Sequence, residues 1–190
     1  MKKTLLTILP LLLIVGCSKE QPINDETLIE KGRLRYHPDT KELYSGKVFT
    51  SYLGGNKKLE GSYKDGKRDG LETRWYENGQ KDYEGTYKDG KEDGKWTDWY
   101  SNGQKSIERT YKDRKKDGLR TKWYENGQKR DEGTYKDGKK IGLRTYWYEN
   151  GQKYKEETYK NGELISEQCW YDESGRECEE CGDYWFSGCK

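Results

Sequence analysis

Cysteines are the residues of this 190-residue chain whose chemistry is easiest to predict, and one of the five stands apart from the rest. Cys17 follows a basic start, an apolar run over residues 5–15 and Gly16. The run is too short for a permanent membrane span, because a spanning helix needs about 20 residues. It is typical of a secretory signal, so we expect residues 1–16 to be removed.

The segment Ile14-Val15-Gly16-Cys17 resembles a bacterial lipobox. This resemblance implies that Cys17 becomes the first mature residue and carries acyl chains, each buried methylene contributing about 0.8 kcal/mol of membrane affinity. Ser18, which is not Asp, favours the outer membrane in a double-membraned cell. We expect residues 17–31 to be a lipidated tether. The alternatives are an ordinary signal peptide and a cytosolic protein with an apolar start.

The other four cysteines gather near the C-terminus, at Cys169, Cys178, Cys181 and Cys189. In an exported protein an even number of cysteines indicates disulfides, here two with three possible pairings. A four-thiolate zinc site is the alternative, but only one Cys-x-x-Cys pair is present; a redox motif is a third possibility. We expect residues 164–190 to be a degenerate last repeat and a Cys-rich cap over the last sheet edge.

Residues for catalysis are scarce. His37 is the only histidine, and no Gly-rich phosphate loop precedes a helix. The carboxylates recur with a repeat, which is typical of solvated sheet positions and not of a catalytic pair in a cleft. We therefore expect no enzymatic activity, and no metal or cofactor.

Composition restricts both the partner and the fold. Without residues 1–16, which hold two lysines, the chain has 35 basic and 35 acidic residues, so a strongly basic nucleic-acid binder is not expected. Only 29% of residues are hydrophobic, whereas seven are Trp and seventeen are Tyr, so aromatic rings must build the core. The absence of alanine and the 23 glycines favour strands and tight turns over helices.

A 24-residue repeat sets the positions of the elements. The same residue types recur every 24 positions. They are the tyrosines Tyr63, Tyr87, Tyr111, Tyr135 and Tyr159, the glycines Gly70, Gly94, Gly118 and Gly142, and four Trp-Tyr pairs, each separated by one residue from a following Asn-Gly. Tandem repeats of this length indicate an array in which neighbouring units share a core.

Each unit is predicted to be a β-hairpin. Asn78-Gly79 between aromatic-bearing runs predicts a two-residue turn with positive φ at both residues, which would pair Arg74 with Tyr83 and Trp75 with Asp82. Strand alternation places Leu71, Thr73 and Trp75 on one face and Glu72, Arg74 and Tyr76 on the other. The predicted fold is all-β: an elongated, single-layer antiparallel meander of 24-residue hairpins over residues 32–163.

The motifs Tyr135-Lys136-Asp137-Gly138 and Trp123-Tyr124-Glu125-Asn126-Gly127-Gln128 resemble the bacterial variant of the MORN repeat. The resemblance covers about residues 32–177 and departs at Arg114, at Ile141 and in the shifted last copy. It implies an elongated scaffold for protein binding near membranes, with no catalytic residues to transfer. Some bacterial members are catalogued as antitoxins, a function at odds with an exported, lipid-anchored chain.

The recurring aromatic pairs are the candidate binding residues: Trp75, Trp99, Trp123 and Trp147, with Tyr76, Tyr100, Tyr124 and Tyr148. They form either a ladder for a ligand or the cross-strand packing of the sheet. The chain is expected to be a membrane-anchored scaffold at the cell envelope that binds a protein. The alternatives are a glycan- or peptidoglycan-binding lipoprotein and an antitoxin.

Overall fold

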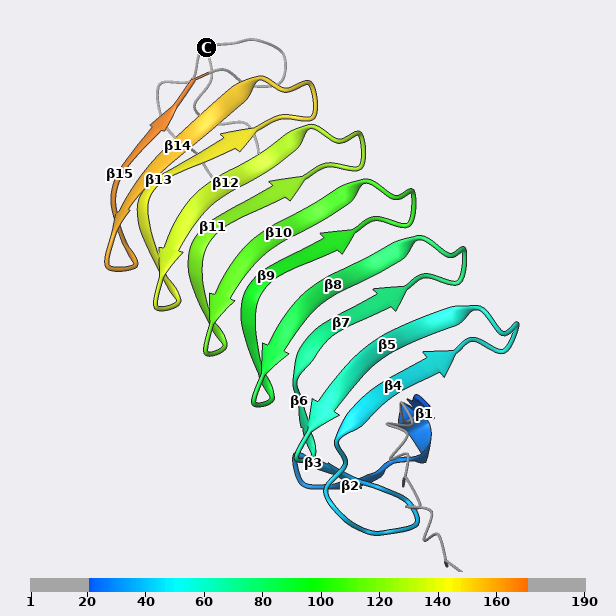
Figure 1. The fold of residues 1–190 in the computed structure, drawn as a ribbon. Helices are drawn as coiled ribbons and strands as arrows, with labels where there is room; N and C mark the ends of the chain where they lie inside the picture. The colour runs from blue at the N-terminus through cyan, green and yellow to red at the C-terminus, as the bar shows by residue number, and fades with distance from the viewer. Residues whose placement is uncertain (1–20, 171–190) are drawn as a thin grey trace, which may run out of the picture.

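The computed structural model describes residues 21–170, most of which form one long, mainly antiparallel sheet, with a separate two-stranded sheet near the start (Figure 1). The predicted signal peptide, Cys17 and the region of Cys178, Cys181 and Cys189 lie outside the described residues. The elements are β1 (Ile23–Asn24), the 3-10 helix η1 (Asp25–Thr27), β2 (Ile29–Lys31), β3 (Leu34–Tyr36), β4 (Gly46–Ser51), β5 (Lys57–Lys64), β6 (Lys67–Arg68), β7 (Gly70–Trp75), β8 (Lys81–Lys88), β9 (Lys91–Trp99), β10 (Lys105–Lys112), β11 (Lys115–Trp123), β12 (Lys129–Lys136), β13 (Lys139–Trp147), β14 (Lys153–Lys160) and β15 (Glu163–Cys169).

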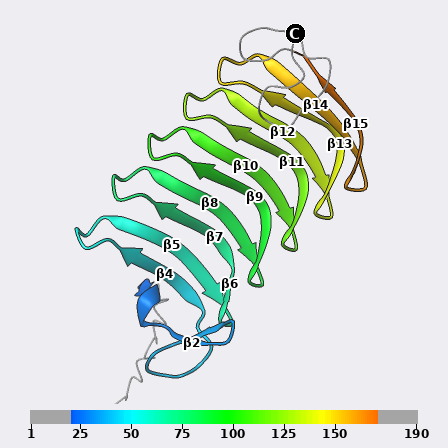
Figure 2. The ribbon, with the colours of Figure 1, turned by 180° about the vertical axis from the view of Figure 1, so that it is seen from behind.

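The predicted meander is confirmed. From β7 to β15 every strand pairs with its neighbours in the chain, so the sheet grows by one hairpin per 24 residues. Seen from both sides, it is a single twisted layer of bowed hairpins (Figures 1 and 2). A second layer would need an apolar face rich in Val, Ile and Leu, which this sequence lacks. We refer to β7–β8, β9–β10, β11–β12 and β13–β14 as units A, B, C and D.

The two turns of a unit differ from the prediction. At the Asn-Gly turn only Gly79 has positive φ, at 84°, and Tyr76 N donates to Gln80 O at 2.8 Å across a three-residue loop. The two-residue turn with positive φ at both positions is instead Asp89-Gly90, with φ of 50° and 75°. Asp tolerates this left-handed conformation better than most residues, which explains the Lys-Asp-Gly-Lys pattern.

The longer Asn-Gly loop shifts the strand register. Arg74 pairs with Tyr83 as predicted, but Trp75 pairs with Lys81 and not with Asp82, because Asp82 is the extra residue of a bulge. Asp82 consequently shares a face with Arg74, to which it is ion-paired at 2.5 Å. The same shift recurs in units B, C and D.

The start of the array is more ordered than predicted. Residues 23–31, which we assigned to the tether, form β1, η1 and β2, and β1 pairs in parallel with β4. Leu28 is buried with Tyr44, Val48 and Tyr63 in the core cluster of this end. Tether-like sequence is thus limited to the residues that precede Ile23, since Leu28 supplies an apolar anchor within the polar segment.

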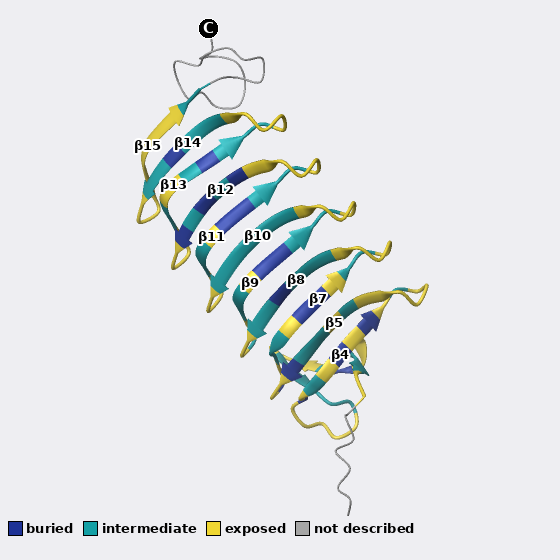
Figure 3. Ribbon diagram, turned by 45° about the horizontal axis from the view of Figure 1, so that its top comes forward, coloured by how far each residue is buried: buried dark blue, intermediate teal, exposed yellow. Residues whose placement is uncertain are grey.

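In units A to D the buried residues lie within the strands, whereas the turns along both edges are largely exposed (Figure 3). The buried hydrophobic residues between 21 and 170 are few, and Trp96 and Tyr135 are the ones in units A to D. Buried polar residues, by contrast, occur in every unit, among them Glu72, Arg120 and Asp131. The sheet is therefore held by polar contacts between units as much as by apolar packing.

Candidate binding faces of the sheet

One face repeats the same side chains in successive units, and we call it the constant face. It carries the columns of Thr73 and Trp75 on the first strand of a unit and of Lys81 and Glu84 on the second. The column of Leu71 also lies here and is interrupted by Lys95 in unit B. The Thr73 hydroxyl donates to Glu84 Oε2 at 3.2 Å, and Lys81 Nζ reaches the same oxygen at 2.6 Å. This arrangement links the two strands of a hairpin.

The tryptophans of the constant face are half-buried, and each lies under a lysine of the preceding unit. Lys81 Nζ stands 5.4 Å from the ring centre of Trp99, a cation–π distance. The equivalent pairs are Lys57 with Trp75, Lys105 with Trp123 and Lys129 with Trp147. The candidate tryptophans thus connect adjacent units, and a ligand stacking on them would have to displace a lysine.

The tyrosines of the Trp-Tyr pairs point to the opposite face and also connect units. The Tyr76 hydroxyl donates to Trp99 O at 2.8 Å, and the Tyr100 and Tyr124 hydroxyls donate to Trp123 O and Trp147 O at 2.7 and 2.9 Å. Each of these hydrogen bonds pairs with the carbonyl of the last residue in the first strand of the next unit, and it holds the tyrosine ring in place. The fourth tyrosine, Tyr148, stacks on Tyr154 at 4.4 Å.

The face that carries Glu72, Arg74 and Tyr76 changes from unit to unit, and we call it the variable face. In unit A the buried Glu72 is ion-paired with Arg68 and accepts a hydrogen bond from the Tyr83 hydroxyl. Burial raises the pKa of Glu72 even though Arg68 opposes it. Burial and the Glu72 contact also raise the pKa of Tyr83.

In unit B the position of Glu72 is taken by Trp96, which is 6% exposed. Its ring stacks on Tyr83 at 5.7 Å and meets Tyr87 and Tyr111 edge-on. The ring covers Gly85, where a Cβ would lie 2.1 Å from it. This aromatic cluster depends on a glycine in the facing strand.

In units C and D the same position is arginine. Arg120 and Arg144 both contact Asp131, at 2.7 and 2.5 Å, and all three are largely buried. Burial and the charge of Arg120 lower the pKa of the nearby Lys122. The environment of Lys122 therefore lacks enough negative charge to balance its cations.

Glu157 of unit D, unlike Lys122, is surrounded by groups that stabilise its charged form. Burial alone would raise its pKa, but hydrogen bonds from Tyr146, Tyr159 and Lys155 lower it to about 2. Burial and the bond to Glu157 in turn raise the pKa of Tyr146. The ionised carboxylate is thus a fixed structural charge.

Charge is consequently uneven along the variable face. In units A and B, with β6, three basic side chains face four acidic ones: Arg68, Arg74 and Arg109 with Glu72, Asp82, Glu92 and Asp98. In units C and D seven basic side chains face two acidic ones: Lys116, Arg120, Lys122, Arg130, Lys140, Arg144 and Lys155 with Asp131 and Glu157. The small net charge of the whole chain, +2, conceals this basic half.

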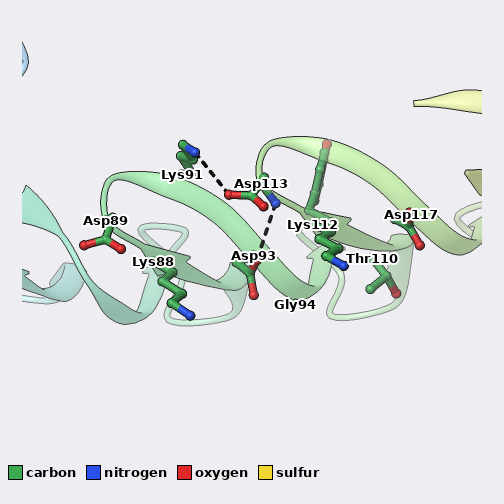
Figure 4. Close-up of a pocket in the computed structure, with 10 residues that line it drawn as sticks. Lys88, Asp89, Lys91, Asp93, Gly94, Thr110, Lys112, Asp113 and Asp117 are labelled. Carbon is green, nitrogen blue, oxygen red and sulfur yellow. Dashed lines mark hydrogen bonds and ion pairs between the residues drawn. The ribbon is translucent and has the colours of Figure 1, made fainter. Parts of the chain in front are cut away.

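The turn edge of units A to C has a shallow cavity of about 490 Å³, shown in Figure 4. Lysines and aspartates alternate around it, and Lys91 Nζ contacts Asp113 at 3.1 Å. Asp93 accepts the backbone N–H of Asp113, as Asp69 and Asp117 do for the turns at Asp89 and Asp137. The aspartates therefore brace the turns; at Ile141 this carboxylate is missing.

The remaining candidate residues have local roles. His37 accepts the backbone N–H of Asp39 at Nδ1, at 3.2 Å, and so closes a turn. Cys169 ends β15; its disulfide, the pairing and the cap remain predictions. Between residues 21 and 170 there is no cluster of three or more metal-ligating side chains, and no helix there is long and apolar enough to cross a membrane.

The variable face is not among the candidates predicted from the sequence, because those candidates are the residues that the units share. Trp96, Arg120 and Arg144 stand at the position of Glu72, 24 residues apart. The signal in the sequence is the change of residue type at this one position of the 24-residue repeat.

A comparison with protein families finds four tandem matches to the MORN repeat variant, at residues 68–89, 92–113, 116–137 and 140–161. These matches correspond to units A to D. No curated protein matches the chain significantly.

Proposed function

Since residues 68–161 are four tandem MORN repeat variants, we propose that this chain is a non-enzymatic protein-binding scaffold, anchored through Cys17 at the cell envelope, that contacts its partner with the variable face. MORN repeats commonly bind proteins or membranes. The observation that carries the proposal is the difference between the two faces. Constant-face side chains repeat the same contacts between units, whereas most variable-face side chains differ between units that have the same backbone.

The basic half of the variable face indicates the charge of the partner. Complementary charge steers association and selects partners more than it adds affinity. Lys122 and Arg130 have no ion-pair partner among residues 21–170, so an acidic surface is the matching one.

The test is capture of envelope proteins by the purified full-length chain. We expect Lys122→Glu combined with Arg130→Glu to reduce capture at least tenfold without changing the thermal midpoint. Lys47→Glu, which makes a similar change on an exposed residue of the other face, is the control and should capture as the unaltered chain does. Capture that is equal in all the variants would refute the proposed face.

The anchor is tested separately. Cys17→Ser should move the chain from the membrane fraction to the soluble fraction, and continued membrane partition would contradict lipidation.

A glycan-binding role is the second candidate, because the tryptophans form a regular column. Retention on purified peptidoglycan that is lost in Trp99→Ala and Trp123→Ala, with the fold intact, would support it in place of protein binding. The lysines over these rings make that result less expected.

A further inference from the structure

A hollow of about 560 Å³ opens on the variable face between units A and B. Its wall includes the ring of Tyr100, the small side chain of Ser106 and two ion pairs, Arg74 with Asp82 and Arg109 with Asp98. The hollow lies outside the basic half of this face.

Equivalent tyrosines elsewhere in the sheet are covered by the residue six positions later. Lys58 stands over Tyr52 at 5.7 Å and Arg130 over Tyr124 at 5.7 Å. In unit D Tyr154 stacks on Tyr148. In unit A the residue is Asp82, which lies near Tyr76; burial and this carboxylate raise the pKa of that tyrosine. This position, in the bulge, therefore normally interacts with the tyrosine.

Ser106 is too short for this interaction. Within residues 21–170 no aromatic ring or cation covers Tyr100, although its hydroxyl holds the ring in place through Trp123 O at 2.7 Å. Unit B thus presents a fixed tyrosine ring whose intramolecular cover has been replaced by a hollow.

We infer that this hollow binds the guanidinium group of an arginine side chain presented by the protein partner. The inference rests on the proposed function and adds the chemistry of one contact. Two of the three covering side chains elsewhere are cations, and a planar guanidinium combines the charge of Lys58 with the flat stacking of Tyr154.

The carboxylates of the hollow complete the site. Asp98 receives Arg109 at Oδ2, and among the described residues it has no other ion-pair partner. A carboxylate has two oxygens and accepts several hydrogen bonds, so Oδ1 of Asp98 is available to a second guanidinium. The hollow therefore offers a ring face for stacking and an acceptor for orientation.

The experiment titrates the full-length chain with N-acetyl-arginine amide and follows the tyrosine ring signals by NMR. We expect saturation at one site, and binding of N-acetyl-citrulline amide, which is equal in size but uncharged, at least tenfold weaker. Ser106→Arg should weaken arginine binding at least tenfold, because it installs the cover that Arg130 provides in unit C.

Each outcome decides the inference. Absence of saturable binding, equal binding of the citrulline compound, equal binding by Ser106→Arg, or binding of N-acetylglucosamine in place of the arginine compound would overturn it. Thermal midpoints show whether the variants are folded, and Ser106→Ala controls for loss of the serine. If Ser106→Arg captures envelope protein normally while Lys122→Glu with Arg130→Glu does not, the proposed function stands and this site does not.

Discussion

Trp75 and Tyr76 are neighbours in the chain, yet they act on opposite faces of the sheet. The tryptophan lies under Lys57, and the tyrosine hydroxyl binds the backbone of the next unit. Their regular spacing is thus explained by contacts between units. Residues that depart from the repeat are more informative about function than those that the units share. For two of them, Glu157 and Arg114, we predict the effect of substitution on stability.

We predict that Glu157 stabilises the folded chain at neutral pH and that this contribution is lost in acid. Its pKa in the folded chain, about 2, is below that of an unfolded glutamate, so its contribution is present above about pH 4.5 and is lost as the pH falls towards 2. Glu157→Gln should lower the free energy of unfolding by up to about 3 kcal/mol at pH 7, since the pKa is lowered by more than 2 units and one unit corresponds to about 1.4 kcal/mol. Urea unfolding between pH 7 and pH 2 measures it.

The difference between Glu157→Gln and the unaltered chain should shrink as the pH falls to 2. Glu163→Gln, at an exposed position of β15, should follow the unaltered chain throughout. A difference that is independent of pH would show that the carboxylate charge is not responsible.

We predict that replacing Arg114 stabilises the folded chain. It has φ of 69° at a turn position where units A and C have glycine, a conformation that costs other residues about 1–2 kcal/mol. Arg114→Gly should raise the free energy of unfolding by about 0.5–1 kcal/mol after loss of the exposed contacts of Arg114. Gly138→Arg, the reverse change in the turn of unit C, should lower it. Chemical denaturation measures both, and effects of the opposite sign would refute the turn assignment.

At the scale of the strand pair, the backbone is common to all units and the side chains across it are matched. Gly85 and Gly61 occupy equivalent positions, but Gly85 faces Trp96 whereas Gly61 faces Glu72. A Cβ at Gly85 would lie 2.1 Å from the indole ring, while one at Gly61 would have its nearest neighbour at 3.5 Å. The same substitution therefore has different consequences in adjacent units.

Gly85→Ala should reduce the free energy of unfolding by about 1–3 kcal/mol, the usual cost of forcing a side chain out of a packed position. Gly61→Ala should cost well under 1 kcal/mol, because the new methyl group makes an ordinary contact. Thermal or urea unfolding of the two variants tests this. Equal effects would mean that Trp96 does not lie over Gly85.

The sequence predicted the strands and their faces because period-two alternation and turn residues are local signals. It misplaced the two-residue turn, since Asn-Gly and Asp-Gly both favour positive φ and only the register separates them. It missed the Arg120–Asp131–Arg144 contact, because this joins residues that no local pattern connects. Residues 23–31 were predicted to be part of a tether. Their order could not be predicted locally, because Leu28 is buried against Tyr63, which is distant in the sequence.

For the molecule as a whole, a single layer leaves both faces of every hairpin accessible along the length of the array (Figures 1 and 2). The constant face repeats the same contacts between units, whereas most side chains of the variable face differ from unit to unit. The variable face changes from nearly balanced charge in units A and B to strongly basic in units C and D. An elongated partner surface could therefore be recognised by several units, each with its own side chains.

The most direct measurement of this division between faces is hydroxyl-radical footprinting of the full-length chain, free and with its captured envelope protein. Side-chain oxidation reports each face separately, because Trp75, Trp99, Trp123 and Trp147 lie on one face and Tyr83, Tyr100 and Tyr124 on the other. We predict that the partner protects the tyrosines of the variable face and leaves Trp75, Trp99, Trp123 and Trp147 unchanged. Protection of the tryptophans with unchanged tyrosines would contradict the account.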